Sequence, residues 1–288
     1  MAHTMIKLIT PVVFERSKVQ ISYSDKILVI GSCFADNVGE KMAQAGLDVM
    51  VNPFGTLYNP VSIANSLSRL SKEIYFTEKD CVQMGAGVEK ICSFSHHTSF
   101  ARATKEEFLA NANAELEKAS AFYKNCNKVI ITLGTSFCYS REGEVVSNCL
   151  KRPAAEFSRF MMDASRTQMI LSCLLADDDR EFIFTVSPIR HLADGAQANQ
   201  LSKASLIVAV NNICSQFSNT AYFPAYEIVM DELRDYRFYA EDMTHPSAQT
   251  IGYLWERFVD FALLPQEKEK LLEQEKLYRQ SQHRPITG

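Results

Sequence analysis

The chain has 288 residues, of which 47% are hydrophobic and 22% are charged, and its formal net charge is −4. This apolar share is enough for one sizeable core, and α/β domains of this length often form a single unit. The mild acidity and the scattered Lys and Arg residues disfavour nucleic-acid binding, which depends on clustered positive charge.

The lack of a recognisable targeting segment and the spacing of the cysteines exclude further classes of protein. The sequence has no run of about eighteen apolar residues, so no membrane span is predicted. Residues 1–9 lack a basic segment followed by an apolar stretch, so no signal peptide is predicted. The eight cysteines lie far apart and no pair has C-x-x-C spacing, so neither a zinc knuckle nor a dithiol redox site is predicted. We therefore expect a cytoplasmic protein with free thiols, no metal and no cofactor.

Short apolar runs alternate with segments of helical character along most of the chain. The predicted elements, in chain order, are strand 26–30, helix 35–45, strand 47–51, helix 62–70, helix 104–126, strand 128–133, helix 166–175, strand 181–186, helix 199–217, strand 221–226 and helix 247–261. Residues 72–100 are irregular, and a hairpin is expected around 141–143. From residue 266 onward, leucines among charges predict a surface helix.

Five apolar strands separated by helices predict a parallel sheet that is covered on both faces. The expected fold class is α/β, a three-layer α/β/α sandwich with a five-stranded, mainly parallel sheet. Residues 1–265 would form one domain with 72–100 as an irregular insertion, and 266–288 would form a C-terminal helical tail. Ligands of such sheets bind at the carboxyl ends of the strands. Four segments follow strands at that edge, namely 31–32, 52–59, 134–136 and 187–191.

Ser32 follows the first strand, so its hydroxyl is expected on a tight turn at a helix N-terminus. Backbone N–H groups there stabilise negative charge, which suits a serine nucleophile whose own N–H helps to hold an oxyanion. The same position also suits a serine that only caps the helix. Cys33 is an alternative nucleophile, because a thiolate is stabilised at a helix N-terminus, although a small cysteine can equally pack in a core.

Asp242 and His245 lie three residues apart, just before the last predicted helix. In such a turn the carboxylate can hold one imidazole nitrogen while the other nitrogen reaches a nucleophile. A surface turn with a capping aspartate would have the same sequence. Together, Ser32, Asp242 and His245 predict a catalytic triad, with His245 as the base and Asp242 as the orienting carboxylate.

The combined pattern resembles a known family. A Gly-Ser turn after the first strand and D-x-x-H before the final helix is the arrangement of the SGNH hydrolases. The segment GSCFA at 31–35, followed by VNPFGTLYNP at 51–60, resembles the GSCFA family, which takes its name from the first motif. Segments 133–136, 185–191 and 222–226 resemble later blocks of that family, so the similarity covers most of the chain.

The resemblance implies an SGNH-type fold and the hydrolysis or transfer of an acyl group, with Ser32 as the nucleophile. It also implies that Gly55 donates a backbone N–H to the oxyanion. Ser136 stands where SGNH enzymes carry an oxyanion-binding Asn. The loss of one such donor typically costs about 2.7–4 kcal/mol of transition-state stabilisation. Asn59 or Asn148 could supply an amide from another loop.

Basic residues near the same edge are candidate substrate ligands. Arg190, His191 and Lys203 could together bind a carboxylate or a phosphate, or could form ordinary ion pairs between a loop and a helix. His97 is a further candidate. A metal shared by His96 and His97 is not expected, because adjacent residues of an extended segment point to opposite faces.

Two functions stay open at this point. The first is a serine esterase or acyltransferase that acts on a small-molecule ester, with an O-acylated carbohydrate as the substrate that the resemblance suggests. The second is a catalytically silent module of the same fold that binds a glycan or a protein, which the missing Asn favours. The tail at 266–288 could also join two copies of the chain.

Overall fold

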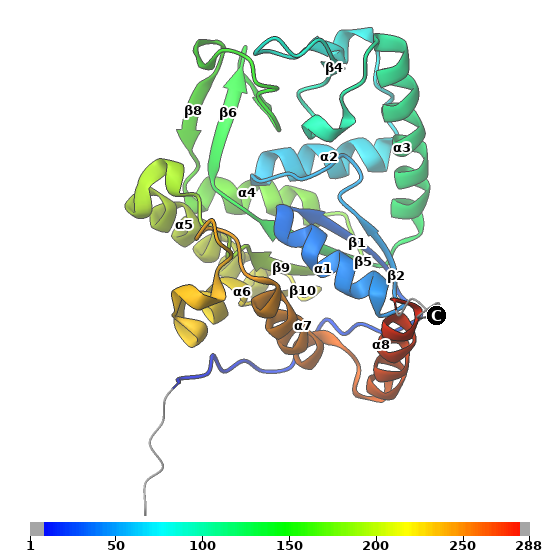
Figure 1. The fold of residues 1–288 in the computed structure, drawn as a ribbon, viewed down its shortest axis with the longest axis vertical. Helices are drawn as coiled ribbons and strands as arrows, with labels where there is room; N and C mark the ends of the chain where they lie inside the picture. Colours follow the sequence, from blue (N-terminus) through cyan, green and yellow to red (C-terminus); the bar gives the residue numbers. More distant parts are fainter. Residues whose placement is uncertain (1–8, 283–288) are drawn as a thin grey trace, which may run out of the picture.

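The computed structural model describes residues 9–282, and its centre is a five-stranded sheet (Figure 1). The strands of this sheet are β1 (Lys26–Gly31), β2 (Asp48–Val51), β5 (Lys128–Leu133), β9 (Glu181–Val186) and β10 (Thr220–Phe223). They lie in the order β10-β9-β5-β1-β2, and each neighbouring pair is parallel. This is the doubly wound, flavodoxin-like order, in which the chain reverses direction across the sheet between β1 and β5.

Helices cover both faces of the sheet. On one face lie α2 (Pro60–Lys72), α3 (Lys105–Asn125), α4 (Ala164–Leu175) and α5 (Gly195–Gln216), and on the other lie α1 (Cys33–Gln44), α7 (Ala248–Ala262) and α8 (Lys268–Gln282). Leu28 and Ile30 of β1 pack into the first layer, while Ile27 and Val29 pack into the second. Successive side chains of a strand point to opposite faces, so a strand that is covered on both sides must be apolar throughout.

The predicted three-layer sandwich with a five-stranded parallel sheet is therefore confirmed. Most predicted bounds differ from the observed ones by one to four residues. The strand expected at 221–226 ends at Phe223, because Pro224 has no N–H to donate and the chain turns into α6 (Ala225–Glu227). A π-helical segment at Ile228–Leu233 follows α6.

Two excursions beyond the carboxyl edge of the sheet pack against each other, and we call residues 73–104 and 136–163 the cap. The first contains the hairpin of β3 (Val82–Gln83) and β4 (Ile91–Cys92). The second is an antiparallel sheet of β6 (Phe137–Arg141), β7 (Glu144–Val146) and β8 (Ser158–Met161), which includes the predicted hairpin. Backbone bonds from Gly85 N–H to Leu150 O and from Ser147 N–H to Phe94 O join the two parts.

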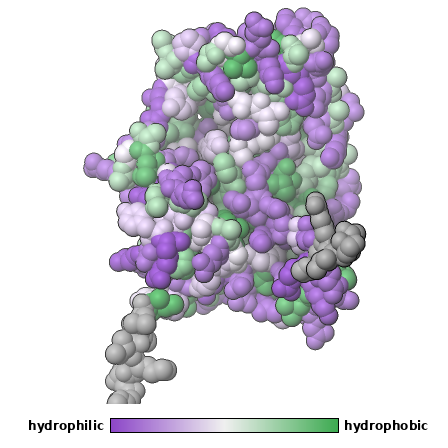
Figure 2. All heavy atoms as spheres, in the orientation of Figure 1, coloured by the Kyte–Doolittle hydropathy of each residue, from purple (hydrophilic) through white to green (hydrophobic). Residues whose placement is uncertain are grey.

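Short 3-10 helices complete the described elements. They are Glu78–Asp80, Thr98–Phe100, Ala154–Glu156, Leu192–Asp194, Tyr236–Phe238 and Pro265–Glu267. No helix of the described residues has the length and apolar character to cross a bilayer. Figure 2 shows hydrophilic residues over most of one face of the molecule, with hydrophobic residues in small scattered groups.

The predicted C-terminal helix corresponds to α8, which packs against its own domain. Leu271 is buried with residues of α1 and α7, and the Trp255 indole N–H donates to Glu275 at 2.9 Å. Leu272 and Leu277 of the same helix are exposed. Residues 283–288 of the predicted tail lie outside the described residues.

His96 lies in the cap and is fully buried among aromatic rings. The four rings that contact it belong to Phe54, Phe76, Phe100 and Phe108. Its Nδ1 lies 2.7 Å from Ser93 Oγ, and its Nε2 has no partner among the described residues. Burial, with the charge of Arg69, lowers the pKa of His96 to about 3.

This burial makes the fold sensitive to acid. The unfolded chain takes up a proton on His96 near pH 6.5 and the folded chain does so near pH 3, so stability that is present above pH 6.5 is lost as the pH falls. We expect His96→Phe to remove this dependence. Between pH 6.5 and 4.5, urea denaturation should show that the wild type loses about 2–3 kcal/mol more than the variant. Parallel losses in both proteins would contradict the account of His96.

Candidate active site

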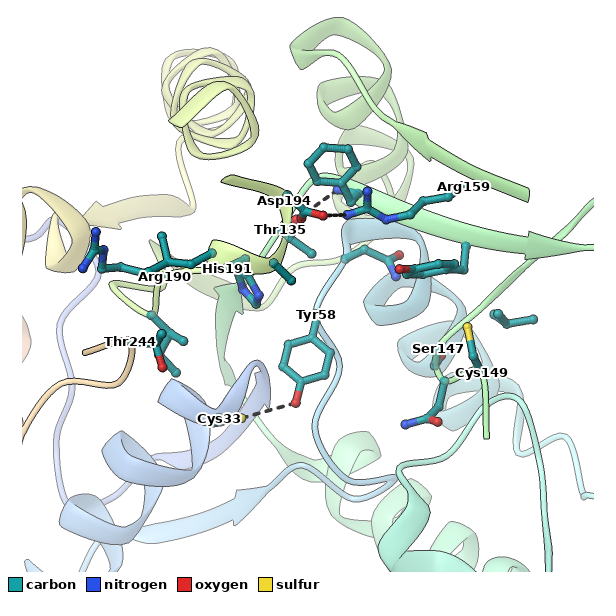
Figure 3. Close-up of a pocket in the computed structure, with 18 of the residues that line it drawn as sticks. Cys33, Tyr58, Thr135, Ser147, Cys149, Arg159, Arg190, His191, Asp194 and Thr244 are labelled. Carbon is teal, nitrogen blue, oxygen red and sulfur yellow. Dashed lines mark hydrogen bonds and ion pairs between the residues drawn. The ribbon is translucent and has the colours of Figure 1, made fainter. Parts of the chain in front are cut away.

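A cavity of about 580 Å³ lies at the carboxyl edge of the sheet, beside the switch point between β1 and β5 (Figure 3). Its walls come from the starts of α1 and α2, the loops after β5 and β9, the turn before α7, and the cap. In doubly wound sheets this crevice is where ligands bind. The edge predicted from the sequence therefore holds a cavity.

Ser32 caps α1 but does not line this cavity, and it is only 1% exposed. Its N–H donates to Thr132 O and Oγ1, each at 3.0 Å. Its hydroxyl lies 3.1 Å from Thr132 Oγ1 and accepts the N–H of Phe34 at 3.3 Å. Both groups needed for its predicted roles as nucleophile and oxyanion donor are thus engaged inside the turn. The arrangement gives those roles no support and fits the capping alternative.

Cys33 is the first residue of α1, and it lines the cavity. Gly31 makes the turn before it possible, because its φ is +140° and an added Cβ would lie 2.1 Å from Thr132 O. The N–H of Cys33 has no partner within residues 9–282, as expected at the first position of a helix. The Cys33 sulfur therefore sits at a helix N-terminus, where developing negative charge is stabilised.

Tyr58 stands beside this thiol. Its hydroxyl lies 3.4 Å from Cys33 Sγ and accepts the Thr56 hydroxyl at 3.3 Å (Figure 3). Burial raises the pKa of Tyr58 to about 12, and the hydrogen bond with Cys33 acts in the same direction. The phenol therefore keeps its proton at neutral pH and can donate it in a hydrogen bond to the sulfur.

Asp242 and His245 form the predicted pair. His245 Nδ1 lies 2.5 Å from Asp242 Oδ2, and Asp242 Oδ1 accepts the backbone N–H groups of Thr244 and His245, each at 2.9 Å. The backbone N–H of His245 is the main reason why the pKa of Asp242 lies well below its ordinary value. The ionised carboxylate thus holds Nδ1 and leaves Nε2 free to act on another group. His245 lines the same cavity as Cys33, although no hydrogen bond among the described residues joins them.

Gly55 and Ser136 do not reach the cavity. The N–H of Gly55 donates to Asn52 O at 2.7 Å, and its φ of +79° closes a turn in which an added Cβ would lie 2.3 Å from His97 Cβ. Ser136 is buried, and its N–H donates to Ser202 Oγ at 2.8 Å. Neither is placed to bind an oxyanion, so both predicted roles lack support.

Asn59 does line the cavity. Its Oδ1 accepts the N–H of Ser62 at 2.9 Å and so caps α2. This bond fixes the orientation of the amide, and its NH₂ group has no partner among residues 9–282. Asn148 also lines the cavity, and its Oδ1 accepts the N–H of Leu150. The position of Asn59 fits the alternative in which another loop supplies the missing amide.

The four basic candidates separate into two pairs. Arg190 and His191 line the cavity, whereas His97 and Lys203 do not. His97 Nδ1 lies 3.0 Å from Ser99 Oγ and accepts the backbone N–H of Ser99. His97 is therefore the N-cap residue of the 3-10 helix Thr98–Phe100. Burial lowers the pKa of His191 to about 4, and the charge of Lys203 acts in the same direction. Within residues 9–282 no group of three or more His, Cys, Asp or Glu side chains is arranged to hold a metal ion.

Lys203 is completely buried and ties two loops together. Its ammonium donates to Gly134 O at 2.6 Å and to Ser187 O at 2.7 Å, which joins the ends of β5 and β9 beneath the cavity. A side chain in this position cannot meet a substrate. The predicted substrate-binding role of Lys203 is therefore replaced by a structural one.

This burial has a measurable consequence at mildly alkaline pH. Burial lowers the pKa of Lys203 to about 7, so the unfolded chain binds a proton near pH 10.5 that the folded chain binds only near pH 7. The free energy of unfolding should therefore rise with pH across this interval. Lys203→Met should remove about 1–2 kcal/mol of the rise between pH 7 and 8.5, as measured by chemical denaturation. Equal slopes in the two proteins would show that Lys203 is not the group responsible.

The fold and the site define the class first: a doubly wound α/β sandwich with an Asp–His pair at the carboxyl edge of its sheet. The chain belongs to the GSCFA family, which matches residues 26–258 and confirms the predicted resemblance. Among curated proteins, none matches the chain.

One similar solved structure is a carbohydrate esterase family 2 enzyme with a carbohydrate binding domain, from Corynascus thermopiles (Myceliophthora fergusii). It has 14% sequence identity and a TM-score of 0.42, and the match covers 86% of this chain and 66% of that one, just under two thirds of its length. A similarity this distant says nothing about the substrate.

Proposed function

We propose that the protein is an acyl hydrolase or acyltransferase in which the Cys33 thiolate is the nucleophile. His245 would be its base, and Asp242 would orient the imidazole. The observation that carries this proposal is that Cys33 and His245 line one cavity, while Ser32 is buried outside it. The reaction class is the one predicted from the sequence, but the nucleophile is the neighbouring residue.

The proposed reaction has two halves. His245 Nε2 takes the thiol proton, and the sulfur attacks the acyl carbonyl carbon, so that a C–S bond forms and the carbonyl oxygen becomes an oxyanion. Collapse of this intermediate breaks the C–O bond, and the leaving alcohol takes the proton from the imidazolium. Water or an acceptor alcohol then gives a proton to His245 and attacks the thioester carbonyl carbon, so that a new C–O bond forms. The C–S bond breaks, the acyl product leaves, and the sulfur takes the proton back from the imidazolium.

Two donors of this cavity would hold the oxyanion. Among the described residues, the backbone N–H of Cys33 is unpaired at the start of α1, and the NH₂ group of Asn59 is unpaired at the start of α2. Each such donor is typically worth about 10²–10³ in kcat. Tyr58 would donate its hydrogen bond to the sulfur while the thiolate carries charge.

An O-acylated carbohydrate is the substrate that we propose. Tyr139 of β6 lines the cavity and is 41% exposed, which offers an aromatic face to the C–H groups of a sugar ring. Arg159 of β8 lies 3.9 Å over the Phe137 ring and pairs with Asp194 at 2.6 Å, which links the cap to the loop after β9. These side chains would give the cavity a wall of mixed aromatic and polar character opposite the catalytic residues.

Acetate release from 4-nitrophenyl acetate and from acetylated xylo-oligosaccharides tests this function. We expect the wild type to turn over both substrates, and Tyr139→Ala to lose activity mainly on the oligosaccharide. Folded wild-type protein that binds the oligosaccharides without releasing acetate would instead identify the silent binding module considered from the sequence. Turnover of the simple ester with no preference for a sugar ester would reject the carbohydrate and keep the reaction class.

A further inference from the structure

The turn that carries Asp242 and His245 has few attachments to the rest of the molecule. Both side chains are about half exposed, at 49% and 47%, so burial does not hold them in place. Bonds within the turn, such as Ala240 N–H to His245 O, set its local shape. Met243 has a φ of +56°, in the left-handed region. Within residues 9–282, the hydrogen bonds that join residues 240–245 to residues outside 236–250 all come from a single residue.

That residue is Arg190, in the loop after β9. Its backbone N–H donates to Thr244 O at 3.0 Å, and its Nη1 donates to Met243 O at 3.0 Å. Its guanidinium also lies 5.4 Å from the ring centroid of Tyr239 and 5.8 Å from that of Tyr236. Arg190 therefore clamps two consecutive carbonyls in the middle of the turn between Asp242 and His245.

The direction of the Arg190 side chain fits this role. In Figure 3 it extends past Thr244 and away from Cys33 and Tyr58. Within residues 9–282 it has no ion pair, so its hydrogen bond to Met243 O and its contacts with the two tyrosine rings account for its placement. Arg190 also lines the cavity, so its role as a substrate ligand stays a prediction.

We propose that Arg190 is a positioning residue that sets the distance between the His245 imidazole and the Cys33 sulfur. The inference rests on the proposed function, since it concerns the base of that reaction. Cys33 is fixed by α1, while His245 lies on an exposed turn, so the clamp decides how often the two groups meet. A displacement of about 1 Å at a reacting centre can cost about 10² in rate.

Alkylation of Cys33 tests the clamp without a substrate. Iodoacetamide reacts with the thiolate, and peptide mass spectrometry follows Cys33 separately from the exposed Cys173. At pH 7 we expect His245→Ala to slow the modification of Cys33 at least about tenfold, because the imidazole no longer takes the thiol proton. Arg190→Met should slow it about five- to tenfold, and Arg190→Lys should recover part of the rate, since its amine can still donate to Met243 O.

A double variant and a matched control complete the test. If Arg190 acts through His245, Arg190→Met combined with His245→Ala should be no slower than His245→Ala alone. Arg234→Met removes a nearby positive charge whose contact is with Asp231, at 2.6 Å, and should leave the rate unchanged. Thermal unfolding of each variant checks that the fold persists.

The outcomes distinguish the positioning role of Arg190 from the proposed reaction of Cys33 and His245. A wild-type rate in Arg190→Met with a slow rate in His245→Ala would overturn the clamp and keep the proposed function. A further multiplicative loss in the double variant would also overturn it. A wild-type rate in His245→Ala would reject both the clamp and the reaction that it supports.

Discussion

Replacing Cys33 with alanine is expected to lower acyl-ester turnover at least about 10³-fold, while Ser32→Ala should retain turnover within about tenfold. Cys33 contributes the sulfur that faces the cavity, and without it no thioester can form. Ser32 is the N-cap residue of α1, and both its hydroxyl and its N–H already have partners. The loss in the cysteine variant corresponds to at least about 4 kcal/mol of activation free energy.

The serine variant needs a stability control. Its hydroxyl caps α1, so Ser32→Ala should lower the free energy of unfolding by about 0.5–2 kcal/mol. Measuring kcat/KM and denaturant unfolding on the same preparations separates this effect from catalysis. An inactive, folded Ser32→Ala beside an active Cys33→Ala would restore the serine mechanism predicted from the sequence.

The second large effect is expected at His245. His245→Ala should lower kcat by about 10²–10⁴-fold with little change in KM, because the base acts on the thiol and the leaving alcohol rather than on substrate binding. Asp242→Asn should cost less, about 10–100-fold. Its Oδ1 can still accept the N–H groups of Thr244 and His245, but the amide puts a donor against Nδ1 in place of the carboxylate.

The measurement for this pair is steady-state kinetics with 4-nitrophenyl acetate. Asp242→Asn serves as the matched variant, since it preserves the size of the side chain and most of the turn. A folded His245→Ala with wild-type kcat would show that another group takes the proton. His191 would then be the next residue to test, because it lines the same cavity and stays neutral at pH 7.

The sheet could be predicted because each of its strands has an apolar pattern that is local in the sequence. Strands buried on both faces must be apolar throughout, as in 128–133, and helices between such strands force parallel order. The cap was less predictable. Its strands are two to five residues long and alternate little, and residues 105–135 separate its two halves in the chain, so no local pattern predicts that they pair.

The choice between Ser32 and Cys33 as the proposed nucleophile depended on a detail that the sequence does not carry. The helix after the first strand was expected to begin at residue 35, whereas it begins at Cys33. One residue along a helix turns a side chain by about 100°. Which of the neighbouring residues 32 and 33 faces the cavity therefore depends on the geometry of the turn at the start of α1.

An error in a helix boundary also explains why the predicted substrate-binding role of Lys203 is wrong. The helix expected from residue 199 begins at Gly195, so Lys203 lies more than two turns inside α5 and points into the core. The sequence located the carboxyl edge of the sheet correctly, because that edge follows from strand order. The direction of each side chain at the edge depends on caps and turns, such as those of Gly55 and Asn59, that only the folded chain defines.

The proposed mechanism requires the acyl group to pass through Cys33. The most direct test is to quench the wild type in acid during turnover of 4-nitrophenyl acetate and to locate the acetyl group by fragmentation of the peptide that contains residues 32 and 33. We predict an acetyl group on Cys33 that neutral hydroxylamine removes, as it does from thioesters, and no such adduct in Cys33→Ala. An acetyl group on Ser32 that resists neutral hydroxylamine would show that Ser32, and not Cys33, is the nucleophile.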